Sequence, residues 1–89
     1  MYEVKVSSWA QAKSIVEREV EERLKGKIKS SWVEEIWLTP HSEGSKWMVK
    51  LRVLVKMGFI KNRGYIVHAV LNSFTGEIEE FEVRESSKK

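Results

Sequence analysis

Cysteine is absent from the sequence, and its absence excludes several kinds of chemistry. Without thiols the chain can form no disulfide, no thiolate nucleophile and no cysteine-based zinc site. Aspartate is absent too, so all 13 acidic residues are glutamates. Amide side chains are few, and a high content of Lys and Glu with so few thermolabile residues resembles the composition of thermophile proteins.

Long apolar runs are also missing, and no stretch approaches the roughly 20 residues that a membrane-spanning helix needs. Residues 1–14 contain no apolar core of a signal peptide. We therefore expect a cytoplasmic protein without a membrane partner. With 89 residues, 42% of them hydrophobic and 33% charged, the chain is expected to form one globular domain.

Residue sets for catalysis or metal binding are scarce as well. The two histidines, His41 and His68, fall in a predicted turn and a predicted strand, without a third ligand at metal-binding spacing. No Gly-x-Ser-x-Gly elbow and no phosphate-binding glycine loop is present. Glu80 and Glu82 share a strand face but are expected to be exposed, which does not suit acid–base catalysis. The sequence thus predicts no enzyme activity, no cofactor and no metal.

One helix is predicted over about residues 8–25. Ser8 and Gln11 form a capping box, in which each side chain can satisfy a free backbone donor. The apolar residues that follow form one stripe at helical spacing, and the stripe consists of Trp9, Ala12, Val16, Val20 and Leu24. Gly26 is suited to the position just after the helix.

Alternating apolar residues predict four strands, over about residues 31–39, 46–57, 64–72 and 77–84. The clearest is 46–57, where every odd position from Trp47 to Val55 is apolar. A short strand is also expected before the helix, at Tyr2 to Val6, and turns are expected at residues 41–45, 61–64 and 73–76. Ile78 is out of phase with Phe81 and Val83, which predicts a bulge in the last strand. Residues 85–89 are expected to form a flexible tail.

Short connections favour antiparallel neighbours, and a single helix with one apolar stripe must cover one face of the sheet. The predicted fold class is therefore α+β, with a short N-terminal strand and one long helix packed on a four-stranded antiparallel meander. Trp9 and Trp47 are expected in the core. Trp32 and Trp37 have opposite parity along their strand, so one of the two should point away from the helix.

Three segments together resemble a PepSY-type domain: Trp47-x-Val49-x-Leu51, then Tyr65-x-Val67-x-Ala69, then the Thr75–Ile78 turn "TGEI". The order of strand, helix and four strands is also similar to cystatin-like folds. The resemblance covers residues 8 to 84 and implies a binding or regulatory domain. It does not imply protease inhibition, because the hairpin "TPHSEG" lacks the Gln-x-Val-x-Gly motif of cystatins. Asn72 stands where the PepSY hairpin usually has an acidic residue.

The sheet face opposite the helix is the predicted interaction surface, because an apolar patch there would mark an interface. Its candidate residues are Trp37, Met48, Lys50, Arg52, Leu54, Lys56, Ile66, His68 and Val70. The expected partner is another protein or a second copy of the chain in a homodimer.

Nucleic acid is the alternative partner. No carboxylate occurs from Gly44 to Gly76, and the candidate phosphate contacts in this interval are Lys50, Arg52, Lys56, Lys61 and Arg63. An outward tryptophan beside them could stack on a base. Alternatively, Glu35 and either Glu80 or Glu82 in the flanking strands would pair with these cations and neutralise the surface.

Overall fold

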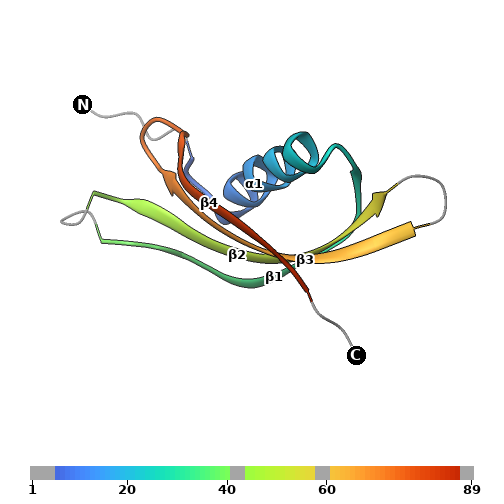
Figure 1. The fold of residues 1–89 in the computed structure, drawn as a ribbon. Coiled ribbons are helices and arrows are strands. Elements are labelled where there is room, and N and C mark those ends of the chain that lie inside the picture. Colours follow the sequence, from blue (N-terminus) through green and yellow to red (C-terminus); the bar gives the residue numbers. More distant parts are fainter. Residues whose placement is uncertain (1–5, 41–43, 58–60, 87–89) are drawn as a thin grey trace.

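The computed structural model describes residues 6–40, 44–57 and 61–86, which form one helix and four strands (Figure 1). The elements are α1 (Trp9–Leu24), β1 (Lys27–Leu38), β2 (Lys46–Met57), β3 (Lys61–Asn72) and β4 (Ile78–Glu85). The strands lie in the order β1-β2-β3-β4, and each is antiparallel to its neighbours. The α+β class, with one helix on a four-stranded antiparallel meander, is confirmed.

The core lies between α1 and the concave side of the curved sheet (Figure 1). From the helix, Ala12, Val16 and Val20 are completely buried. They meet the odd-numbered residues of the two central strands, which are Trp47, Val49, Leu51, Val53 and Val55 in β2 and Tyr65, Val67, Ala69 and Leu71 in β3. Because side chains alternate across a strand, this packing leaves the even-numbered residues of both strands on the opposite side of the sheet.

The start of the helix differs in part from the prediction. Ser8 accepts a hydrogen bond from the Gln11 N–H, as a capping box requires, but the Gln11 side chain accepts from the Ser7 N–H rather than from Ser8. The expectation that Trp9 is a core residue is wrong, since its side chain is 55% exposed. Trp9 is the first residue of the helix, and Val6 fills the core at this end instead.

Val6 is held in place by two hydrogen bonds. Its N–H donates to the Ser73 carbonyl at 3.0 Å, and its own carbonyl accepts from the indole N–H of Trp47 at 2.9 Å. Most of the predicted N-terminal strand falls in residues 1–5, outside the described residues. Val6 and Ser7, which are described, are not in a strand.

The boundaries after the helix also differ. Lys25, at φ +54°, is the left-handed residue that ends the helix, rather than Gly26. β1 then begins at Lys27, four residues earlier than predicted, because Ile28 already pairs with Val55 of β2. Residues 61–64 form the start of β3 instead of a turn, and their ladder with β2 continues to the Lys61–Met57 pair. The connection, residues 58–60, lies outside the described residues.

The last hairpin contains the expected bulge and a well-bonded turn. The register between β3 and β4 shifts at Glu79, so Ile78, Phe81 and Val83 all lie on the helix side. In the turn, the Asn72 side-chain oxygen accepts from the N–H groups of Phe74 and Thr75, and Gly76 adopts a left-handed φ of +81°. Asn72 thus organises the turn without an acidic group. β4 includes Glu85, and residues 87–89 of the predicted tail lie outside the described residues.

Candidate interaction surface

The face of the sheet that α1 does not cover, here called the open face, consists of rows of residues that stand opposite one another across the strands. The rows are Trp37–Met48–Val70–Glu80, Glu35–Lys50–His68–Glu82, Trp32–Arg52–Ile66–Arg84, Ser30–Leu54–Gly64 and Lys27–Lys56–Asn62. All nine residues of the predicted interaction surface belong to these rows. These rows mix apolar and charged side chains, so apolar contact area and charges lie side by side on this face.

Both Trp32 and Trp37 lie on the open face, although the sequence predicted only one of them there. The register of β1 shifts between Val33 and Glu35, and Glu34 is the extra residue of this bulge. The extra residue reverses the alternation, so Trp32 stands opposite Arg52 and Trp37 stands opposite Met48. Their side chains are 53% and 50% exposed. The bulge therefore gives the open face two aromatic residues on the same strand.

The exposed apolar side chains are concentrated on β1, which is an edge strand. Four of the five large hydrophobic residues that are exposed in the described part of the chain belong to it, namely Trp32, Val33, Trp37 and Leu38. Val33 and Leu38 stand opposite Leu51 and Trp47 and therefore point to the helix side, where α1 leaves them uncovered. The second half of β1 is thus apolar and accessible on both sides of the sheet.

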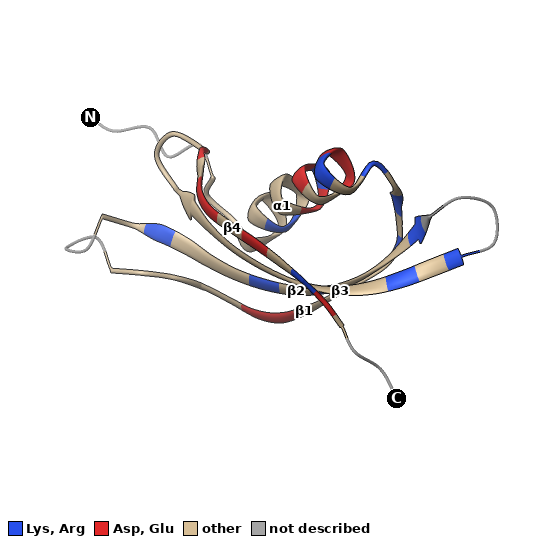
Figure 2. Ribbon diagram, viewed as in Figure 1, with Lys and Arg blue, Asp and Glu red and all other residues tan. Residues whose placement is uncertain are grey.

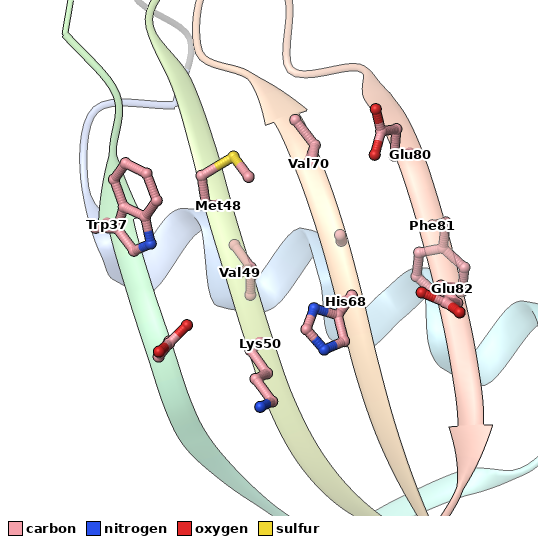
Figure 3. Close-up of a pocket in the computed structure, with 11 residues that line it drawn as sticks. Trp37, Met48, Val49, Lys50, His68, Val70, Glu80, Phe81 and Glu82 are labelled. Atoms are coloured by element: carbon pink, nitrogen blue, oxygen red, sulfur yellow. The ribbon is translucent and has the colours of Figure 1, made fainter.

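A shallow groove of about 270 Å³ crosses the open face between the two edges (Figure 3). Trp37 borders it on β1, while Glu80 and Glu82 border it on β4. Between them, Figure 3 shows Met48, Lys50, His68 and Val70 pointing out of the sheet toward the viewer, with the helix behind. The groove is open to solvent, so a flat or extended partner fits it better than an enclosed small molecule.

Several cations of the open face have carboxylates beside them, whereas Lys56 stands opposite Lys27. Arg52 Nε lies 2.9 Å from a Glu34 oxygen, and Lys46 Nζ lies 2.7 Å from a Glu79 oxygen. Lys50 stands between Glu35 and His68 in the register. Acidic residues appear in the middle of β1 and on β4, on either side of the basic residues of β2 (Figure 2). This arrangement leaves the open face with little excess charge of either sign.

The five candidate phosphate contacts are not on one face. Lys50, Arg52 and Lys56 lie on the open face, but Arg63 stands opposite Val55, whose side chain belongs to the core. Arg63 instead forms an ion pair with Glu85 at 2.9 Å. Lys61, two residues before Arg63, shares its side of the strand.

The Lys46–Glu79 pair ties β2 to β4 across the intervening strand. The hydrogen bond from Lys46 is the main cause that lowers the pKa of Glu79, and a second hydrogen bond from Asn72, at 3.1 Å, adds to it. The same Lys46–Glu79 hydrogen bond raises the pKa of Lys46. Both side chains are partly exposed to solvent, so this pair adjusts the stability of the hairpin rather than preparing a reactive group.

Several residues of this surface had no signal in the sequence prediction. Glu35, Glu80 and Glu82 line the groove, but the sequence prediction did not include them in the interaction surface. Trp32 belongs to the surface because of the bulge at Glu34, and two consecutive glutamates in a strand give no indication of an inserted residue. Val33 and Leu38 are exposed on the helix side because α1 does not cover them, which depends on how the helix lies on the sheet.

Neither a metal-binding group nor a membrane-spanning helix occurs among the described residues. Among the described residues, no three His or Glu side chains form a group that could hold a metal ion. Within the same ranges, no helix is long and apolar enough to cross a membrane. Comparison of the chain with protein-family models, with curated proteins and with solved structures gives no match.

Proposed function

We propose that the protein is a small, non-enzymatic, cytoplasmic binding domain, and that it acts through protein–protein contacts made by β1 and the open face beside it. The observation that carries this proposal is the pair of half-exposed tryptophans, Trp32 and Trp37, on one face of an edge strand. Tryptophan is among the residues most enriched at the centres of protein interfaces. An edge strand also offers unpaired backbone N–H and C=O groups to a partner strand.

The chemistry of the hydroxyl groups supports a non-enzymatic role. Ser45 and Ser73 are the buried polar residues of the described chain, and their hydroxyls hydrogen-bond to each other at 2.7 Å. The Ser73 N–H also donates to the Ser45 carbonyl. These contacts fasten the start of β2 to the end of β3, so the two serines have a structural task. The carboxylates of the groove, Glu80 and Glu82, are exposed.

The balance of charge on the open face favours a protein partner over nucleic acid. A surface that binds phosphates needs cations free to replace counterions. Here Arg52 and Arg63 each have a carboxylate at 2.9 Å. Nucleic-acid binding by Lys50, Arg52 and Lys56 beside the tryptophans is the second candidate function. The resemblance to PepSY-like domains and cystatin-like folds stays a prediction, which the arrangement of one helix across a meander supports.

Site-specific photo-crosslinking in cells that produce the protein tests the proposed function. A benzophenone amino acid placed at Trp37 should form adducts with protein. The matched control is the same substitution at Glu80, which ends the same row of the open face at the other edge. Adducts at position 37 and not at position 80 would support binding through β1, whereas equal yields at both, or none at either, would contradict it.

A binding assay with single-stranded oligonucleotides distinguishes nucleic-acid binding, the second candidate function, from protein binding. If nucleic acid is the ligand, the affinity should fall steeply with added salt, because each phosphate contact releases a counterion. A Lys50→Glu variant should then lose this binding, and the protein adducts at position 37 should be missing. We expect weak binding that does not respond to Lys50→Glu.

A further inference from the structure

We infer that the partner of β1 is a second copy of the same chain, whose own β1 adds antiparallel to this edge and joins two four-stranded sheets into one. The inference rests on the proposed function, because it names the partner of the same surface. Three features of β1 point to it: the order of its charges, the position of Trp32, and the contrast with β4.

The charges of β1 are ordered so that the strand is complementary to itself in the antiparallel direction. Lys27 and Lys29 lie in its first quarter, and Glu34 and Glu35 lie in its second half (Figure 2). A two-fold axis near Ser31 and Trp32 brings the basic part of each strand beside the acidic part of the other, at both ends of the contact. Parallel pairing would instead place like charges together, which is unfavourable.

Three of these four charges are available for a partner, while Glu34 is already paired with Arg52. Within the described ranges, Lys27, Lys29 and Glu35 take part in no ion pair. Lys27 also stands directly opposite Lys56 of β2, and like charges in that position destabilise a sheet. A carboxylate supplied by the second copy would relieve this repulsion. In the single chain, this pair of lysines has no such carboxylate partner.

The tryptophans extend the same contact over the open face. A two-fold axis perpendicular to the joint sheet keeps the open faces of both copies on one side. Trp32 lies next to this axis, so the two Trp32 side chains come together there and lose exposed apolar area. Trp37, five residues further along, reaches the start of the partner's β1. The basic residues in that part of the strand can lie against its indole ring.

The opposite edge explains why such an assembly stops at two copies. β4 carries Glu79, Glu80, Glu82 and Glu85 with a single arginine, Arg84. Two copies of β4 would place carboxylates against carboxylates in either direction. With β1 paired and β4 protected, no apolar edge remains for a third chain, and the product is a closed dimer rather than a filament.

Charge reversal on the intact chain tests this inference. Sedimentation or light scattering over a range of concentrations should give a dimer for the natural sequence. Lys29→Glu and Glu35→Lys should each raise the dissociation constant about tenfold or more, because each places like charges together at both ends. The double variant, Lys29→Glu with Glu35→Lys, should recover the dimer. Mixing the two single variants should also recover it, as a heterodimer.

The same reversals on β4 serve as controls. Arg84→Glu and Glu82→Lys change the net charge equally but lie on the far edge, so they should leave the dissociation constant unchanged. Circular dichroism confirms that each variant is folded. A natural chain that stays monomeric, or a double variant that does not recover the dimer, would overturn the inference.

The crosslinks at position 37 show whether a negative result contradicts only the homodimer or also the proposed function. Adducts with the mass of two chains support the homodimer. Adducts with a different protein, together with a monomeric chain, leave the proposed function standing and overturn only the inference. A monomeric chain without adducts overturns both.

Discussion

The two edges of the sheet, β1 and β4, are built differently. β4 is 8 residues long, and its apolar residues Ile78, Phe81 and Val83 all turn toward the helix. The rest of its surface is charged. β1 is 12 residues long and exposes large apolar side chains on both of its faces. β4 is short and charged, as natural sheet proteins often make their edges to prevent strand addition, whereas β1 is longer and exposes apolar side chains.

The difference teaches that exposed apolar residues in this protein are not a general consequence of its small size. A chain of this length can build only a small core, yet the apolar residues of β4 all pack against that core. There Arg23 of the helix lies over the Phe81 ring at 4.4 Å from its centroid. In β1, Ile28 and Ile36 pack against the core, but Val33 and Leu38 have no such cover. The exposed tryptophans of the sheet are thus confined to one edge strand, which is what a dedicated binding surface requires.

The largest expected effect is on the free energy of unfolding, when one aromatic residue from each edge is replaced by alanine. Phe81→Ala should lower the free energy of unfolding by about 2 kcal/mol or more, because it removes a side chain packed between sheet and helix. Trp37→Ala should change it by less than about 1 kcal/mol, because half of that side chain is already in water. Urea unfolding at low protein concentration measures both. Equal losses would show that Trp37 is a structural residue and would remove the contrast.

An intermediate effect concerns the inner side of β1. The Ser31 hydroxyl oxygen is buried and has no hydrogen-bond partner among the described residues. Ser31→Ala removes this unsatisfied group and should stabilise the fold by about 1 kcal/mol. The control is Ser30→Ala, whose side chain lies on the open face, where water can satisfy it. A higher thermal midpoint for Ser30→Ala than for Ser31→Ala would contradict this account of β1.

The smallest effect is electrostatic and belongs to β4. Because the pKa of Glu79 is lowered in the folded chain, its carboxylate stabilises the fold above the ordinary titration range and loses this contribution as the pH falls through the lowered value. Glu79→Gln should therefore reduce stability slightly at neutral pH and not at all in strong acid. Thermal midpoints across this range measure the difference, with Glu77→Gln as the control. A Glu79→Gln effect that is independent of pH would contradict the ion-pair explanation.

Much of the fold could be predicted because local patterns and packing agree. The capping residues before α1 and the unbroken alternation of β2 each permit one structure, and β2 has the predicted bounds. The bulge at Glu79 was also predictable, because three apolar residues out of phase can reach one core only if the strand contains an extra residue. The start of β1 was missed because Ile28 is the only apolar residue between Lys27 and Ser31, so the alternation there is weak.

The candidate surface was less predictable because its composition depends on pairing. The even-numbered residues of β2 and β3 follow from alternation alone. Trp32, in contrast, reaches the open face only through the bulge at Glu34, where both neighbouring residues are polar and no apolar residue is out of phase. The exposure of Trp9 depends likewise on where the helix begins relative to the sheet, which is a tertiary feature.

The extra residue in β1 has a consequence for how such a surface can change. Removing one residue between the two tryptophans would turn one of them from the outside of the molecule to the inside while leaving its chemical identity intact. Changes in the length of this strand should therefore alter recognition more abruptly than most replacements of its side chains. For engineering, a single-residue deletion at Glu34 is a direct way to halve the aromatic content of one face.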